Sequence, residues 1–358
     1  MPEPFSSNPI RLSVREWLIT FGVVAIIAIT LPGIWWALTP FTPDADYRVP
    51  YDQSEDYWLY RHFARIAGEG EGALLIGDSV IWGQYVARDQ TLSHHLNELA
   101  GAGRFVNLGL DGTHPIALEG LIRHYGRAIR NRDVILHLNL LWLSSPQADL
   151  SAEGASRTAR FNHPRLVPQF SPRIPSYSET VSGRVSVVLE RKVRLFEWAR
   201  HVRSTGFDNT NLQVWTAEHP YENPLGRISV RLPDRDEHQD PTVRSPGGGG
   251  AVGQSLPWID RETSLQWMGF ERLVEVLRRR NNRIHVIIGP LNEHMLDDAS
   301  REEYRRLLTD TERALVELDL DYSLLPLLPA DLFADLSHPI GPGYALMAEE
   351  ILKAAGYR

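Results

Sequence analysis

Residues 73–84 of the chain read ALLIGDSVIWGQ, and the rest of the sequence is interpreted outward from this stretch. A continuous apolar run of four residues that ends at glycine is typical of a buried strand in a parallel sheet. The residues that follow, through about Leu99, predict a turn and then a helix. Ser79 then lies at the carboxyl end of a first strand, where open α/β sheets bind ligands. A serine there is a nucleophile if a base reaches it, or the N-cap of the helix, and the stretch alone leaves both interpretations open.

Strand and helix patterns alternate along the chain on both sides of one long interruption. Further strands are predicted at residues 104–108, 133–139, 283–290 and 322–325, and helices at residues 55–67, 115–128, 265–280, 301–317 and 343–355. This alternation predicts an α/β fold, with α/β/α layers around a central parallel sheet. Residues 144–264 carry many prolines and one helical pattern at 185–203. We expect them to form a long insertion near the carboxyl edge of the sheet. The alternative is a separate small domain, which the weak strand signals of the segment favour less.

Composition excludes several classes of function. The chain has 358 residues, of which 43% are hydrophobic, an ordinary value for a globular domain. Its net charge of -8 leaves no basic footprint for nucleic acid. The absence of cysteine excludes disulfides, thiolate metal sites and a cysteine nucleophile. The histidines show no ligand spacing with nearby acids, so neither a metal nor another cofactor is expected.

Residues 17–38 contain no charged side chain and are long enough to cross a membrane as a helix. Trp17 begins the segment and Trp35 lies near its end, which suits the aromatic belts at the two membrane interfaces. The competing interpretation is a cleaved signal peptide. That needs a shorter apolar core and a small-residue cleavage site, for which residues 37–39 are a poor match.

The basic residues around this segment predict its orientation. Arg11 and Arg15 precede it, whereas the first basic residue after it is Arg48. The positive-inside rule then places residues 1–16 in the cytoplasm and the chain after about Thr39 outside it. We expect a single-pass protein of the cell membrane. A juxtamembrane linker at residues 39–54 would lead into an extracytoplasmic domain at residues 55–358, periplasmic in a Gram-negative cell.

Residues 335–338 read DLSH and precede a Pro/Gly-rich entry into the last predicted helix. An aspartate three residues before a histidine can hold its Nδ1 and orient its Nε2 as a general base. The same tetrapeptide is also common as a plain surface loop. Together with Ser79 at a strand end, Asp335 and His338 indicate a Ser-His-Asp triad.

Acyl transfer also requires hydrogen-bond donors for an oxyanion. Gly109 follows the second predicted strand, and without a Cβ atom it lets a substrate approach its backbone N–H. Asn139 ends the third strand, where its side-chain amide can donate. The alternatives are a turn glycine and a strand-end cap. What favours function is that Ser79, Gly109 and Asn139 end three successive strands.

Four blocks in chain order resemble those of the SGNH (GDSL-like) hydrolase superfamily. They are GDS at residues 77–79, NLG at residues 107–109, Asn139, and DLSH at residues 335–338. The resemblance implies a flavodoxin-like α/β/α sandwich. It also implies Ser79 as nucleophile and oxyanion donor, Gly109 N–H and Asn139 as the other donors, and Asp335 and His338 as the rest of the triad. The third block departs from the usual Gly-x-Asn-Asp, because it reads HLNL at residues 137–140.

An anchor followed by such a domain is similar in layout to accessory acyltransferases and esterases of bacterial envelope polysaccharides. Those often act beside a multi-spanning membrane O-acyltransferase. We therefore expect a membrane-anchored serine esterase or O-acyltransferase that acts on acyl esters of an envelope glycan, with acetyl as the expected group. The alternatives are a catalytically inactive glycan-binding or scaffolding subunit and a lipid-directed esterase.

Overall fold

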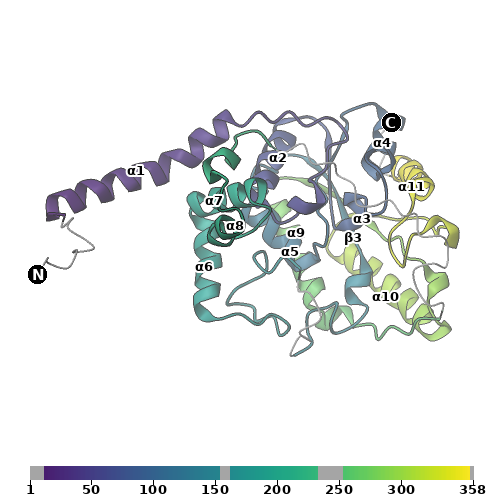
Figure 1. Ribbon diagram of the computed structural model, residues 1–358. Helices are drawn as coiled ribbons and strands as arrows, with labels where there is room; N and C mark the ends of the chain where they lie inside the picture. Colours follow the sequence, from purple (N-terminus) through teal and green to yellow (C-terminus); the bar gives the residue numbers. More distant parts are fainter. Residues whose placement is uncertain (1–11, 154–161, 233–252, 355–358) are drawn as a thin grey trace, which may run out of the picture. The chain divides into compact units, whose positions relative to one another are not determined.

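The computed structural model describes residues 12–153, 162–232 and 253–354 (Figure 1). The chain divides into two compact units, one with residues 1–41 and 189–233, the other with residues 42–188 and 234–358. This grouping puts residues 189–233, which are part of the predicted insertion, in one unit with the N-terminal helix. Residues 1–11 of the predicted cytoplasmic segment, and residues 154–161 and 233–252 of the insertion, lie outside the described residues.

The larger unit contains a five-stranded, all-parallel sheet, as predicted. Its strands are β1 (Ala73–Ile76), β2 (Phe105–Asn107), β3 (Asp133–Leu138), β4 (Arg283–Ile288) and β5 (Asp321–Leu324). Their order is β2-β1-β3-β4-β5. The chain moves outward from β1 to β2 and then returns to the other side of β1. In doubly wound sheets the ligand crevice lies at the carboxyl ends of the two strands at such a reversal, here β1 and β3.

Helices of the larger unit pair with one another beside the sheet. They are α2 (Tyr57–Glu69), α3 (Ser79–Trp82), α4 (Leu92–Ala100), α5 (Pro115–His124), α9 (Leu265–Arg278), α10 (Asp298–Glu317) and α11 (Gly341–Ala354). Helix α4 packs against α11, and α5 packs against α9. The α4–α11 pair shares one buried core with Leu75, Ile135 and Ile287 of three neighbouring strands. All four residues of β1 are buried, as expected of a strand covered on both faces.

Most of the predicted juxtamembrane linker belongs to the larger unit, which begins at Thr42. Arg48 is 2% exposed, and Val49 and Gln53 are each 1% exposed. The Arg48 guanidinium donates to the carbonyls of Trp82 and Gly83 at 3.1 and 2.6 Å and stacks over the Trp82 ring. The residues after the anchor therefore help to hold the loop that follows Ser79.

The smaller unit contains α1 (Val14–Leu38), α7 (Arg194–Gly206) and α8 (Leu212–Glu218). Helix α1 is long and apolar enough to cross a membrane, as the sequence predicts. It begins in a capping box in which Glu16 and Ser13 bond each other. The helical pattern at residues 185–203 proves to be two helices, α6 (Val181–Lys192) and α7, separated at Val193.

Candidate active site

Ser79 is the first residue of α3, three residues after the end of β1, and it is 7% exposed. The side chain that caps α3 is that of Asp78, which accepts the Val80 N–H at 3.0 Å. The Ser79 hydroxyl is therefore not used as the N-cap, which was the alternative left open by the sequence. Its Oγ instead lies 2.8 Å from Nε2 of His338.

His338 lies in the loop between the short 3-10 helix η7 (Ala330–Leu332) and α11. Its Nδ1 is 2.9 Å from each carboxylate oxygen of Asp335. Asp335 Oδ1 also accepts the backbone N–H groups of Ser337 and His338, both at 2.9 Å, so the carboxylate is fixed by its own loop. A carboxylate at Nδ1 favours a proton on that nitrogen. Nε2 is then left to accept the Ser79 hydroxyl proton.

The charges of this pair shift both pKa values. Burial lowers the pKa of His338, but the hydrogen bond and negative charge of Asp335 outweigh it, and the net pKa lies above its ordinary value. Burial raises the pKa of Asp335, and the bonds from His338 and from backbone N–H groups outweigh this, so its net pKa is lowered. Asp335 is thus held ionised beside an imidazole that readily becomes an imidazolium.

Several bonds between distant segments keep Ser79 and His338 facing each other. Tyr344 of α11 donates its hydroxyl to the Val80 carbonyl at 2.8 Å, tying that helix to α3. The Asn292 N–H, after β4, donates to the Leu336 carbonyl at 2.8 Å, two residues before His338. The first bond joins two helices and the second holds the loop that carries His338, so together they support the 2.8 Å Ser79–His338 approach.

Asn139 lies directly after β3, and its side chain points to Asp78. Its Nδ2 donates to Asp78 Oδ2 at 2.9 Å, which uses one of the two amide hydrogens. Its Oδ1 accepts the Leu141 N–H at 3.0 Å, which fixes the orientation of the amide. Asn139 is thus bonded to Asp78, the residue next to Ser79. The second hydrogen of its amide takes part in neither of these two bonds.

Gly109 lies against α3, but its backbone N–H is not unoccupied, as an oxyanion donor would be. That N–H donates to Asn107 Oδ1 at 3.0 Å, so it is already engaged by a neighbouring side chain. The glycine is required for another reason. A Cβ atom at this position would lie 2.5 Å from the Trp82 nitrogen and 2.8 Å from the Ile81 carbonyl carbon. Gly109 therefore lets the end of β2 approach the backbone of α3.

The Asp78 carboxylate is surrounded by polar side chains from β3 and from the turn after it. Besides Asn139, Trp142 donates its indole N–H to Asp78 Oδ2 at 2.9 Å. Nδ1 of His137 lies 3.1 Å from Asp78 Oδ1. The two atoms are close enough for an ion pair, but they do not form a hydrogen bond. Burial raises the pKa of Asp78, and His137, Asn139 and Trp142 outweigh it, so that its net pKa is strongly lowered.

His137 stands at the position where the sequence departs from the pattern it resembles. A Cβ atom on Gly77 would meet the side chain of Ile81 and would lie 2.7 Å from the His137 Cβ, so glycine at 77 lets the turn after β1 approach both residues. The other ring nitrogen of His137, Nε2, lies 2.7 Å from the Gly289 carbonyl at the end of β4. The sequence marked His137 only as a departure and did not reveal its partner across the strands.

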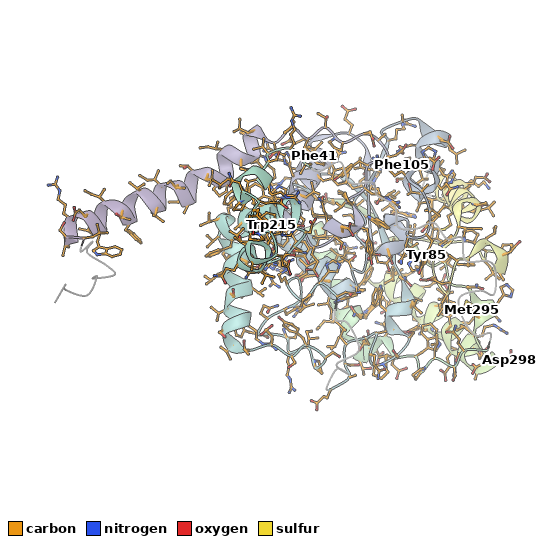
Figure 2. All side chains as sticks on the ribbon, in the orientation of Figure 1. Phe41, Tyr85, Phe105, Trp215, Met295 and Asp298 are labelled. Carbon is orange, nitrogen blue, oxygen red and sulfur yellow. The ribbon has the colours of Figure 1, made fainter. Side chains whose placement is uncertain are left out.

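Tyr85 is a further residue at the site that the sequence did not indicate (Figure 2). Its ring meets the His338 ring edge to face, with centroids 5.4 Å apart. Its φ of 66° is in the left-handed region, which costs a non-glycine residue about 1–3 kcal/mol. Arg48 bonds the carbonyls of Gly83 and Val86 on either side of it, so the loop is held in this conformation from outside.

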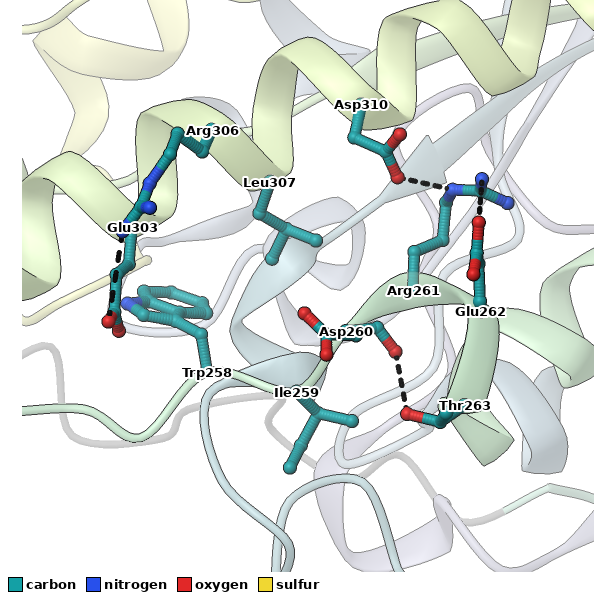
Figure 3. A pocket seen from close by; sticks show the side chains of 10 residues that line it. All are labelled: Trp258, Ile259, Asp260, Arg261, Glu262, Thr263, Glu303, Arg306, Leu307 and Asp310. Carbon is teal, nitrogen blue, oxygen red and sulfur yellow. Dashed lines mark hydrogen bonds and ion pairs between the residues drawn. The ribbon is translucent and has the colours of Figure 1, made fainter.

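A cavity of about 530 Å³ lies between α10 and the short helix η5 (Arg261–Thr263) (Figure 3). Trp258 and Leu307 line it together with charged side chains, of which Arg261 lies 2.7 Å from Asp310. None of the three triad residues is among those that line it. The candidate site is therefore defined by its hydrogen bonds and not by this cavity.

Among residues 12–153, 162–232 and 253–354, no group of three or more His, Asp or Glu side chains is arranged to hold a metal ion. Comparison of the sequence with protein-family models and with curated proteins gives no match.

Proposed function

We propose that the chain is an SGNH-type serine esterase or O-acyltransferase anchored in the cell membrane. The observation that carries the proposal is the continuous path from Ser79 Oγ to His338 Nε2, and from His338 Nδ1 to Asp335. It lies beyond the carboxyl end of β1 in a parallel sheet, next to the strand-order reversal where such sheets bind ligands. The strand order is that of flavodoxin-like folds, which supports a three-layer α/β/α arrangement as the finer description.

In the first half-reaction Ser79 Oγ attacks the ester carbonyl carbon while His338 Nε2 accepts the hydroxyl proton. The carbonyl oxygen becomes an oxyanion, which the Ser79 N–H and the free amide hydrogen of Asn139 stabilise. The C–O bond to the leaving alkoxide then breaks, and His338 returns the proton to that oxygen. The alcohol leaves and an acyl-Ser79 ester remains.

In the second half-reaction water or a sugar hydroxyl attacks the acyl carbon, and His338 accepts its proton. The Ser79–acyl bond breaks and the serine is re-protonated. Hydrolysis and transfer therefore use the same residues and differ only in the attacking hydroxyl. Gly109 contributes a third oxyanion hydrogen bond only if its N–H is shared between Asn107 and the substrate.

The anchor supports an envelope substrate. Helix α1 would hold the catalytic domain at a membrane, with the N-terminus cytoplasmic and the domain extracytoplasmic. An acylated envelope glycan is then the substrate within reach, and a multi-spanning membrane O-acyltransferase is a partner suited to this layout. The strongest alternative is an inactive glycan-binding or scaffolding subunit, which the engaged Gly109 N–H favours.

Labelling with a fluorophosphonate probe distinguishes the enzyme from the inactive subunit. The enzyme forms an adduct on Ser79 and hydrolyses p-nitrophenyl acetate, and Ser79→Ala loses both. Ser182→Ala, on the exposed face of α6, is the matched control and keeps both. No adduct in a folded sample supports the inactive subunit, and full esterase activity in Ser79→Ala removes the proposed mechanism. Faster turnover of long-chain than of acetyl esters would instead indicate a lipid-directed esterase.

A further inference from the structure

Helix α7 is attached to the last turns of α1 by aromatic contacts. The rings of Trp35 and Trp198 meet edge to face, with centroids 5.5 Å apart. Both pack against a small buried core formed by Val202, Phe207 and Trp215 of α7, α8 and the turn between them. The smaller unit is therefore a set of helices built around the point where α1 ends.

The position of Trp35 along α1 fixes the depth of this contact in a membrane. A rise of about 1.5 Å per residue separates Trp17 from Trp35 by about 27 Å. This is close to the thickness of the hydrocarbon core, about 30 Å. If α1 spans the bilayer, the two tryptophans lie at its two interfaces. Helix α7, which contacts Trp35, then lies at the interface where the chain leaves the membrane.

The same helices expose apolar side chains. Phe196 is 45% exposed, Leu212 49%, Leu225 72% and Tyr221 100%. Leu225 lies in the short 3-10 helix η4 (Pro224–Arg227), which follows α8. All four side chains belong to the unit that contains α1, and exposed apolar surface beside a membrane anchor is suited to contact with lipid.

The charge of this segment differs in sign from that of the whole chain. Residues 189–233 hold seven Lys or Arg and five Asp or Glu, whereas the chain as a whole has a net charge of -8. Lys192, Arg194 and Arg231 are exposed, as are Asp208, Glu218 and Glu222, so the basic excess of the segment is small and includes its two flanks. Apolar side chains together with Lys and Arg are typical of helices that lie in the membrane interface, and the basic residues favour anionic lipid.

We propose that residues 192–231, which contain α7, α8 and η4 together with the flanking Lys192 and Arg231, form a membrane-surface platform. The platform inserts its exposed apolar side chains between the headgroups of the bilayer that α1 crosses, and anionic phospholipid is its preferred surface. The inference rests on the membrane anchoring included in the proposed function. It assigns to this half of the insertion a lipid-binding role, separate from the chemistry at Ser79.

The chain contains no cysteine, so a single introduced cysteine can be spin-labelled specifically in the full chain. Leu212→Cys and Leu225→Cys report on the platform. Ile27→Cys, 51% exposed on α1, is the membrane reference, and Val316→Cys, 64% exposed on α10, is the aqueous reference. Each labelled protein is reconstituted at one chain per nanodisc. The discs contain phosphatidylcholine alone or with phosphatidylglycerol, and collision with oxygen and with a water-soluble nickel complex is measured.

We expect the platform labels to collide with nickel several-fold less than the label at 316 and to show a depth between the two references. Nickel collision falls further with phosphatidylglycerol, and Lys192→Glu with Arg194→Glu removes that difference. Platform labels as exposed to nickel as the label at 316, beside a membrane-like label at 27, would overturn the platform and leave the anchor standing. An aqueous label at 27 would overturn both. Equal nickel collision in the two kinds of disc would overturn the anionic preference.

Discussion

Asp78→Asn is the substitution that most directly tests how the site is held together. The Asp78 carboxylate accepts hydrogen bonds from Val80 N, Asn139 Nδ2 and Trp142 Nε1, and it faces Nδ1 of His137. Asparagine has nearly the same shape but only one acceptor oxygen and no charge. Whichever way the new amide is turned, its NH₂ group faces at least one donor that the carboxylate had satisfied.

The expected cost follows from these bonds. A hydrogen bond to a charged group contributes about 1.5–3 kcal/mol, and at least one is lost. The bonds that remain weaken because a neutral acceptor binds about half as strongly. We expect a loss of about 3–5 kcal/mol in the free energy of unfolding and a fall in Tm of about 10 °C. If Asn139 loses its position, kcat for the acetyl ester falls about 10²-fold or more.

Denaturant unfolding and ester hydrolysis of the full chain measure the two effects separately. The matched control is Asp133→Asn at the other end of β3, whose pair with Arg283 is 2.9 Å long and solvent-exposed. That pair contributes less than about 1 kcal/mol. Because the pKa of Asp78 is lowered on folding, its stabilisation is present above about pH 4 and is lost as the pH falls. The difference between wild type and Asp78→Asn should therefore narrow in acid. An Asp78→Asn protein as stable and as active as the control would refute the reasoning.

Three further predictions concern the triad and its surroundings. The value of kcat/KM should increase as the pH rises, with a midpoint above about 6.5. Only neutral His338 acts as the base, and its raised pKa means that a higher pH is needed to deprotonate it. Asp335→Asn should lower kcat by roughly 10⁴-fold and move that midpoint downward; an unmoved midpoint in the residual activity would contradict the assigned cause of the shift. Gly109→Ala should cost about 1–3 kcal/mol of stability, because its Cβ meets the backbone of α3. Gly226→Ala, which has open space around it, serves as its control.

The sheet could be predicted from the sequence because its strands are short, continuous apolar runs. The apolar run at residues 73–76 matches β1 residue for residue, and residues 283–290 contain β4. The triad positions could be proposed for a related reason. Parallel strands bring their carboxyl ends to one edge, so residues that follow different strands become neighbours although Ser79 and His338 are 259 residues apart.

The insertion could not be predicted in the same way, because its helices carry no strong boundary signals. The break between α6 and α7 falls at Val193, where neither proline nor glycine interrupts the pattern. Helix α8 has only seven residues and an Asn211 cap, and it is stabilised mainly through Trp215 in the core of the smaller unit. Such helices depend on tertiary contacts more than on their own sequence. The assignment of this segment to the unit of α1 was therefore visible only in three dimensions.

The residues around Asn139 depart from the pattern that the sequence resembles, yet the structure still fixes Asn139. Leucine stands at 140 where the resemblance would have an acid, and Asn139 is held by the carboxylate of Asp78, in the turn after the neighbouring strand β1. A carboxylate buried among strands requires several donors, and His137, in place of the usual glycine, adds a further polar group beside it. A Cβ atom on residue 77 would meet Ile81 and the Cβ of His137, so the glycine at 77 suits both neighbours. Because the His137 imidazole lies beside the carboxylate that holds Asn139, restoring glycine at 137 should weaken the hold on Asn139 rather than improve it.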